Sequence, residues 1–400
     1  MDRRDFLKQS GLASGYLLIP SFLKPLETIG MNSVDGSSPG KKNLIVIQFS
    51  GGNDGLNTII PYNNDIYYKL RKNIGIKKEN VIALDKELGM NPAMVAFKEL
   101  YDQGYVSIIN NVGYPNPDRS HFRSMDIWQS ASSSKDYIST GWLGRYLDNQ
   151  CQWPYEAIEI DNNLSLALKG KKLNGIATKN PRQLFEETKA PYFDSVSSYV
   201  KPDMLGEDNL GYLYKTMVST TSSAKYIFET QKTYKNTFEY PNTEFSKELK
   251  TISTFINSGL NTSVYYVSLG SFDTHVGQLN KQQDLLTQYS EGVAALVKDL
   301  KENNKLDDTL IITFSEFGRR VEENASGGTD HGTASNMFII GSQLKKKGIF
   351  NEAPDLVNLA DGDLKHHIDF RQVYATVLDN WLKADSVSIL NEKFVNLNFV

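Results

Sequence analysis

Carboxylates and histidines recur in five short segments of this chain, and glycine stands in or beside most of them. The segments are residues 51–57, 116–122, 270–275, 315–319 and 327–332. Carboxylate oxygens and imidazole nitrogens are the ligands that Zn²⁺, Mn²⁺ and Mg²⁺ take in proteins. We therefore predict a site for one or two divalent metal ions. Its predicted ligands are Asp54, Asp273, His275, Glu316, Asp330 and His331.

The four predicted carboxylate ligands would place about four negative charges at one rim. Without partners they would repel one another and raise their pKa values, whereas divalent cations would neutralise them. Each segment also has a structural alternative. Asp54 fits a turn, Asp273 fits the cap of a helix, and Glu316 fits an ion pair with Arg319. Asp330 and His331, flanked by glycines, are the hardest to explain as structure alone.

Ser120 stands where a helix is expected to begin, so it fits either a helix cap or a nucleophile. Beside a divalent metal its hydroxyl could ionise, and the helix dipole would favour an incoming phosphate. His121 could then be a metal ligand or an oxyanion contact. Arg119 or Arg319 could hold a phosphate or sulfate with two hydrogen bonds. We take Ser120, His121 and Arg319 as the candidate catalytic residues.

Strand-like and helix-like patterns alternate along the chain, and several strands are apolar on both faces. This predicts an α/β fold, a doubly wound and mostly parallel sheet with helices on both faces. In such sheets ligands bind beyond the carboxyl ends of the strands, where the five segments lie. The expected strands are 43–50, 106–110, 157–160, 263–269, 310–314 and 336–340. The expected helices are 93–101, 121–131, 142–148, 278–303 and 370–382, with a helical insertion at about 181–259.

Residues 1–32 have the form of a twin-arginine export signal, with Arg3 and Arg4 before a short apolar run. That run is too short and too broken by Gly and Pro for a stable transmembrane span. We expect a linker at 33–42, a single domain at 43–400, and a periplasmic or otherwise exported protein that meets the twin-arginine translocase. The net charge of −4 and the lack of a basic stripe argue against nucleic-acid binding. A single cysteine excludes an internal disulfide.

The motif set resembles the exported bacterial family of unknown function 1501, itself similar to the alkaline phosphatase and sulfatase superfamily. The resemblance covers about residues 43–382 and rests on the five segments and on residues 141–145, Gly-Trp-Leu-Gly-Arg. It implies a doubly wound sheet, two metal sites and a nucleophile at a helix start. It also implies roles for Asp54 as the first-strand metal aspartate, for Ser120 as the nucleophile, and for two metal pairs. These pairs are Asp273 with His275, and Asp330 with His331.

Two departures from the superfamily pattern stand out. The middle pair is Asp-x-His here, where a wider spacing is usual, and the final metal histidine lacks a clear counterpart unless His366 or His367 supplies it. Our main hypothesis is an exported, metal-dependent hydrolase of phosphate or sulfate esters, with a small molecule or polymer as substrate. The alternatives are a non-catalytic exported binding or assembly protein that keeps the fold, and a phosphomutase-like transferase.

Overall fold

The structure is a computed structural model and describes residues 41–189 and 209–400. The predicted signal peptide and nearly all of the predicted linker lie outside the described residues. Within those residues, none of the helices has the length and apolar character needed to cross a membrane.

The strands of the described residues form one large sheet and one small sheet. They are β1 (Asn43–Phe49), β2 (Ile59–Ile60), β3 (Ile82–Ala83), β4 (Gly89–Met90), β5 (Val106–Gly113), β6 (Ala157–Glu159), β7 (Ile176–Ala177), β8 (Val264–Leu269), β9 (Thr309–Ser315), β10 (Ser335–Ile340), β11 (Gly348–Ile349) and β12 (Ile368–Asp369). The large sheet has the order β11-β5-β10-β9-β1-β8-β6-β7, with β12 also on β5, and the small one is β2-β4-β3. Among these strands of the large sheet, β10 alone runs antiparallel to its neighbours.

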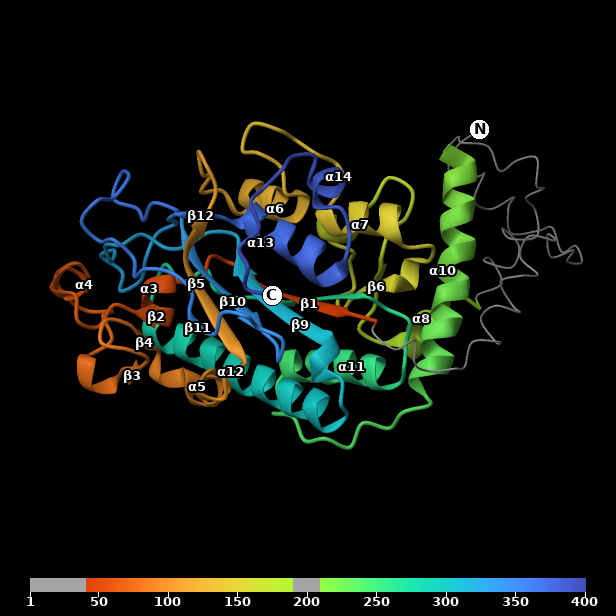
Figure 1. Cartoon of the computed structure of the whole chain (residues 1–400), viewed down its shortest axis with the longest axis horizontal. Helices are drawn as coiled ribbons and strands as arrows, with labels where there is room; N and C mark the ends of the chain where they lie inside the picture. Colours follow the sequence, from red (N-terminus) through yellow and green to blue (C-terminus); the bar gives the residue numbers. More distant parts are fainter. Residues whose placement is uncertain (1–40, 190–208) are drawn as a thin grey trace, which may run out of the picture.

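The α-helices of the described residues lie mainly on the two faces of this sheet. They are α3 (Gly55–Thr58), α4 (Asp65–Leu70), α5 (Val95–Asp102), α6 (His121–Ser130), α7 (Trp142–Gln150), α8 (Pro181–Glu187), α10 (Asn209–Gln231), α11 (Glu244–Asn257), α12 (Gln278–Glu302), α13 (Phe370–Thr376) and α14 (Ser386–Leu390). A π-helical stretch, Val377–Leu382, continues α13. In Figure 1, α6, α7, α13 and α14 lie above the sheet and α5, α11 and α12 lie below it. The predicted α/β architecture is confirmed.

Strand β1 shows why the sheet is covered on both faces. Its side chains alternate between two apolar clusters: Ile45, Ile47 and Phe49 face one cluster, while Leu44 and Val46 face the other. Successive side chains of a strand point to opposite faces, so a continuous apolar run is stable only between two layers. The apolar run that predicts a buried strand in the sequence therefore also accounts for the three-layer arrangement.

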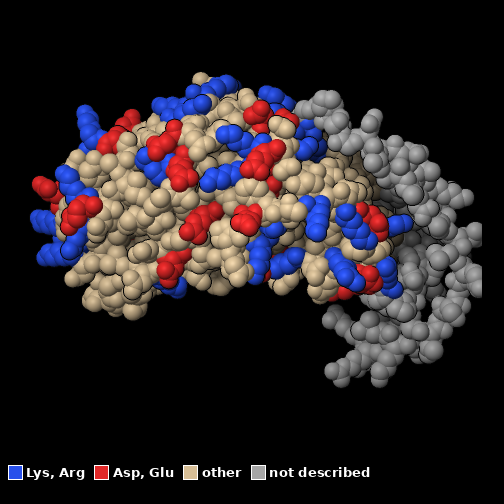
Figure 2. All heavy atoms as spheres, turned by 90° about the horizontal axis from the view of Figure 1, so that it is seen from below, with Lys and Arg blue, Asp and Glu red and all other residues tan. Residues whose placement is uncertain are grey.

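The predicted helical insertion at 181–259 contains α8, α10 and α11. Helix α11 packs against α12 and β8, within the layer that covers the sheet. Helix α10 stands at the right-hand end of Figure 1, whereas α3, which begins after Asp54, lies at the left-hand end. The described part of α10 is therefore far from the loop after β1. On the face seen in Figure 2, acidic and basic side chains are intermixed.

A buried carboxyl group on β6 predicts a measurable pH dependence of stability. Glu159 is only 4% exposed and accepts a hydrogen bond from the Ser165 amide at 2.7 Å. Burial outweighs that hydrogen bond and raises the pKa of Glu159 from 4.5 to about 7. The folded state thus favours the protonated form, and this stabilisation is complete below pH 4.5 and is lost as the pH rises through about 7.

We expect Glu159→Gln to remove this dependence. Relative to the variant, the wild-type free energy of unfolding should fall by roughly 2–3 kcal/mol between pH 4.5 and 7. Urea unfolding across this pH range measures the difference. Glu302→Gln, at the exposed end of α12, is the control and should run parallel to the wild type. Parallel curves for Glu159→Gln and the wild type would show that Glu159 titrates normally.

Candidate metal centre

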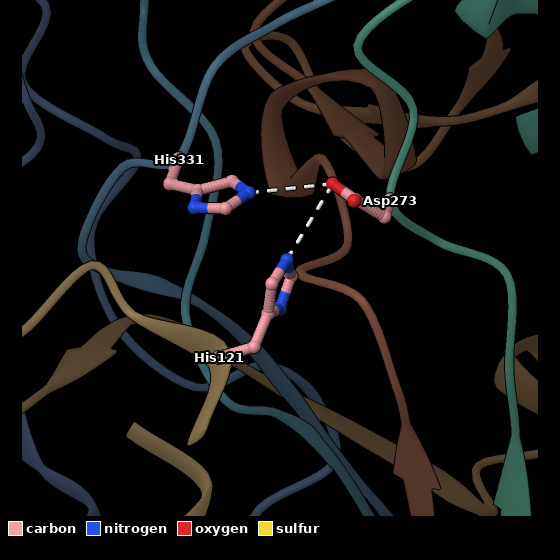
Figure 3. A group of neighbouring side chains, drawn as sticks. All are labelled: His121, Asp273 and His331. Carbon is pink, nitrogen blue, oxygen red and sulfur yellow. Dashed lines mark hydrogen bonds and ion pairs between the residues drawn. The ribbon is translucent and has the colours of Figure 1, made fainter. Parts of the chain in front are cut away.

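Four side chains from three separate segments converge beyond the carboxyl ends of the central strands. His121 is the first residue of α6, Asp273 and His275 follow β8, and His331 lies between β9 and β10. Figure 3 shows the imidazoles of His121 and His331 directed at the Asp273 carboxylate. The structure thus brings together three of the six predicted metal ligands and one predicted catalytic residue.

The distances within this group suit ligands that share one ion. Asp273 Oδ1 lies 3.0 Å from His275 Nε2 and 3.3 Å from His331 Nε2. It lies 3.6 Å from His121 Nε2, and the Nε2 atoms of His275 and His331 are 2.9 Å apart. Ligand atoms about 2.0–2.2 Å from a tetrahedral zinc ion lie about 3.3–3.6 Å from one another. The three spacings from Asp273 Oδ1 fall close to that range, and the ligand atoms of His121, Asp273 and His331 all lie within 4.8 Å of one another.

The outer nitrogen of each histidine is held by an oxygen atom. His121 Nδ1 lies 3.0 Å from Glu316 Oε1, and His275 Nδ1 lies 3.1 Å from Asp330 Oδ1. His331 Nδ1 lies 2.8 Å from the carbonyl oxygen of Arg119. In the tautomer that carries the proton on Nδ1, each of these oxygens accepts that hydrogen bond, and the Nε2 lone pair is available for a metal.

These contacts turn several electron pairs toward one small volume. With Nδ1 protonated, the three Nε2 atoms and the Asp273 oxygen are all acceptors, and acceptors that face one another repel unless a cation lies among them. The Nε2 of His121 is buried and has no hydrogen-bond partner in the structure. An orphaned buried nitrogen aimed at a carboxylate fits a metal ligand, so the residues present suit a divalent ion.

Burial and neighbouring groups shift the pKa values of Asp273, His331 and His121. Burial opposes the ionisation of Asp273, but the hydrogen bond and charge of Arg319 prevail and lower its pKa to about 2. Burial lowers the pKa of His331, which keeps this imidazole neutral at neutral pH. The hydrogen bond that His121 donates to Glu316 raises the pKa of His121. At a pH below this raised pKa, a metal that binds His121 would therefore have to displace the proton on its imidazole.

Arg319 holds the loops of the centre together. Its buried guanidinium donates to the carbonyl oxygens of Gly51, Gly52, Phe272 and Thr329, and to Asp273 Oδ1 at 2.8 Å. A phosphate or sulfate would have to displace these acceptors to reach the guanidinium. The contacts therefore give Arg319, predicted as a catalytic residue, a positioning role.

The Gly51 backbone allows the loops after β1 and β8 to touch. Gly51 has φ +118°, and a Cβ atom there would lie 2.4 Å from the Asp273 amide nitrogen. Any other residue would push the two loops apart. Gly51 also donates its amide to Glu316 Oε1 at 2.7 Å, which orients the carboxylate behind His121.

Asp54 lies apart from the four converging side chains. Its buried carboxylate forms a 2.5 Å ion pair with Arg71 and accepts a hydrogen bond from the Gln278 amide. It also accepts from the Leu56 amide, as the cap of α3. With these partners the carboxylate has little capacity left for a metal. Nothing in the sequence pairs Asp54 with Arg71, 17 residues away.

The other predicted residues lie around the centre. Glu316 and Asp330 contact the histidines from behind. Ser120 caps α6 without a side-chain cap hydrogen bond, and its neighbour Arg119 contributes a carbonyl that sequence reasoning could not assign. His366 lines a pocket beside the centre, and His367 is exposed.

Comparisons with known proteins give one family and several distant structural relatives. The model of the family described as "Protein of unknown function (DUF1501)" matches residues 103–388. No curated protein matches the chain.

Three solved structures illustrate the distant likeness. The PsFucS1 sulfatase from Pseudoalteromonas sp. is 11% identical, with 95% of this chain and 75% of that chain covered and a TM-score of 0.38. A protein in the alkaline phosphatase superfamily from Vibrio parahaemolyticus is 13% identical, with 86% and 70% covered and a TM-score of 0.32. The C-terminal periplasmic domain of EcEptC from Escherichia coli, in complex with Zn, is 10% identical, with 77% and 75% covered and a TM-score of 0.35. At this distance the proposals below rest on the side chains of this chain.

The Asp54–Arg71 ion pair predicts a stability effect separate from metal binding. Removing one partner of a buried ion pair leaves an uncompensated charge, so Arg71→Met and Asp54→Asn should each cost about 3–5 kcal/mol. The double variant should cost less than the sum of the two. Urea unfolding measures the cycle, and exposed Arg182→Met is the control, expected within about 0.5 kcal/mol of wild type.

The same variants test whether Asp54 binds metal. We expect the folded double variant to keep the metal content of the wild type, measured by elemental mass spectrometry. A folded double variant that has lost its metal would assign Asp54 to the metal site instead.

Proposed function

The chain belongs to the DUF1501 family, and we propose that it is an exported, metal-dependent hydrolase of phosphate or sulfate esters. The observation that carries the proposal is the convergence of three oriented Nε2 atoms on Asp273. The twin-arginine segment with Arg3 and Arg4 supports export. We also propose that the twin-arginine translocase carries the chain to the periplasm and that its substrate is an ester.

His121, Asp273, His275 and His331 would hold the ion, which is Zn²⁺, Mn²⁺ or Mg²⁺; the three imidazoles favour Zn²⁺. A bound divalent ion supplies Lewis-acid polarisation of the ester and offsets charge on the leaving oxygen. The Asp54 carboxylate is occupied by Arg71 and Gln278, so we propose one ion rather than two.

We propose Ser120 as the nucleophile. It lies in the chain between Arg119, whose carbonyl contacts His331, and His121, which faces Asp273. It is exposed, and it makes no side-chain cap hydrogen bond at the start of α6. The hydroxyl is therefore free to approach an ester bound over the histidines.

The proposed reaction has two displacements. Ser120 Oγ forms a bond to phosphorus or sulfur, the bond to the alcohol oxygen breaks, and the alcohol leaves with the serine proton. Water then displaces Ser120 Oγ, which restores the hydroxyl and releases phosphate or sulfate. The free amides of the first turn of α6 and the partly exposed Arg119 can stabilise the negative charge of the transferred group.

A non-catalytic exported binding or assembly protein is the second candidate. The hydrogen bonds of Arg319 favour this second candidate. They occupy the guanidinium that was predicted to hold the anion, and Arg119 is then the candidate for a bidentate anion contact. Metal-replete protein that turns over no phosphate or sulfate ester would select this candidate.

The metal content of the protein tests the centre directly. Elemental mass spectrometry should find one equivalent of a divalent ion in the wild type and almost none in His331→Ala. Asp330→Asn, which loosens the support of His275, should weaken metal affinity by about 10–100-fold. Exposed His367→Ala is the control and should keep its metal. Wild-type protein that stays metal-free after loading, or full occupancy in His331→Ala, would refute this centre.

Replacing the serine separates chemistry from metal binding. Ser120→Ala should keep its metal but lower kcat for phosphate or sulfate ester hydrolysis by roughly 10³-fold or more. Ser326→Ala, an exposed serine of the loop that precedes His331, is the control and should keep full activity. Full activity in Ser120→Ala would instead make a water molecule the nucleophile.

A further inference from the structure

An apolar pocket lies beside the histidines and is not used by the reaction described above. Its volume is about 360 Å³, and its walls include Tyr114, Pro117, Trp128, Phe317, Ala334 and Leu364. We propose that this pocket binds a flat apolar group of one or two rings, which is the alcohol part of the ester. This inference rests on the proposed function and names its substrate class.

One aromatic ring borders both the pocket and the metal centre. The Phe317 ring lies 4.9 Å from the His121 ring and 4.7 Å from the His331 ring, between ring centres. The same ring lines the pocket. The pocket and the two histidines therefore share this ring, and the proposed ester extends from one to the other.

Arg119 ties the outer wall of the pocket to the centre. Its carbonyl oxygen contacts His331 Nδ1 at 2.8 Å, and its guanidinium pairs with the fully buried Asp363. Asp363 precedes Leu364, Lys365 and His366, which line the pocket. Arg119 thus contributes to holding the pocket wall and the metal centre in one relative position, and Ser120 follows it in the chain.

The residues that line the pocket are either small or held rigidly by their neighbours. A Cβ atom on Gly113 would lie 2.9 Å from the Cβ of His366, so glycine lets His366 pack closely against this wall. Trp128 is stacked between Phe314 and Phe370, with ring centres 5.0 and 4.2 Å away. A preformed cavity of this kind binds a rigid ring at a small entropy cost, because neither the side chains nor the ligand must become ordered. Its volume is at the small end of the usual ligand range of about 300–1,000 Å³.

Both hydroxyl groups of the pocket lining are engaged within the protein, whereas the buried Nε1 of Trp128 has no hydrogen-bond partner in the structure. The Thr333 hydroxyl donates to the Leu364 carbonyl, and the Tyr114 hydroxyl lies 2.9 Å from Ser124 Oγ. Among the lining residues none is a carboxylate, and Lys365 is the one cation. A sugar placed here would leave several hydroxyl groups unpaired, at a cost for each. An apolar ring leaves none unpaired.

The rim of the centre is apolar as well. Phe122 follows His121 and is 88% exposed, and Val276 follows His275 and is 70% exposed. Exposed apolar side chains next to a polar centre fit a substrate that carries an apolar part beside its anionic group.

The test measures binding apart from turnover. Calorimetry with 2-naphthol, as a two-ring alcohol, should show binding to the metal-loaded wild type. Ala360→Trp, at the exposed edge of the pocket, should weaken this binding at least roughly tenfold, or about 1.4 kcal/mol, with metal content unchanged. Val357→Trp adds the same bulk on the same segment, at an exposed position outside the pocket lining, and should bind 2-naphthol as the wild type does.

Turnover then distinguishes this inference from the proposed function. We expect 2-naphthyl phosphate or sulfate to exceed a glucose ester in kcat/KM, and Ala360→Trp to remove the preference. No binding of 2-naphthol to the wild type, or equal binding in Ala360→Trp, overturns the pocket assignment even if esters are hydrolysed. Binding that Ala360→Trp abolishes, without turnover of any ester, keeps the pocket and rejects the hydrolase.

Discussion

The buried guanidinium of Arg319 is the interaction on which the metal centre depends. It binds the carbonyl oxygens of the loop after β1, of Phe272 and of Thr329, and it pairs with Asp273. A buried charge is stable only when it is paired and hydrogen-bonded, so these segments must stay together for Arg319 to remain inside. The same contacts aim Asp273 at the histidines and keep its carboxylate ionised.

The electrostatic balance of the centre follows from this arrangement. Glu316 and Asp330 contact imidazole nitrogens, Asp54 contacts Arg71, and Asp273 alone remains as a carboxylate among the converging atoms. One carboxylate and three imidazoles suit a single divalent ion better than two ions. The acidic residues near the strand ends therefore differ in their contacts: one lies among the candidate metal ligands, two contact histidines from behind, and one pairs with Arg71.

Much of the fold could be predicted because it depends on local patterns. Strands such as β1 and β9 are continuous apolar runs, and α12 begins and ends within a residue of the predicted helix. The short strands β2, β3, β4, β7, β11 and β12 were missed, since two-residue strands have no period to detect. In the centre, Asp273, His275 and His331 stand out by type and position. The partners of Asp54 and Glu316 could not be predicted, because they depend on contacts between residues far apart in sequence.

Arg119 shows how backbone and side chain can serve two neighbouring sites. Its carbonyl oxygen sets the orientation of His331, while its guanidinium holds Asp363 and the wall of the apolar pocket. A shift of that wall would therefore act on the residue that immediately precedes Ser120. If an apolar ring occupies the pocket, it packs against a wall that is already tied to the metal centre. Ring binding and the position of the serine would then be coupled through one side chain, without any movement of the sheet.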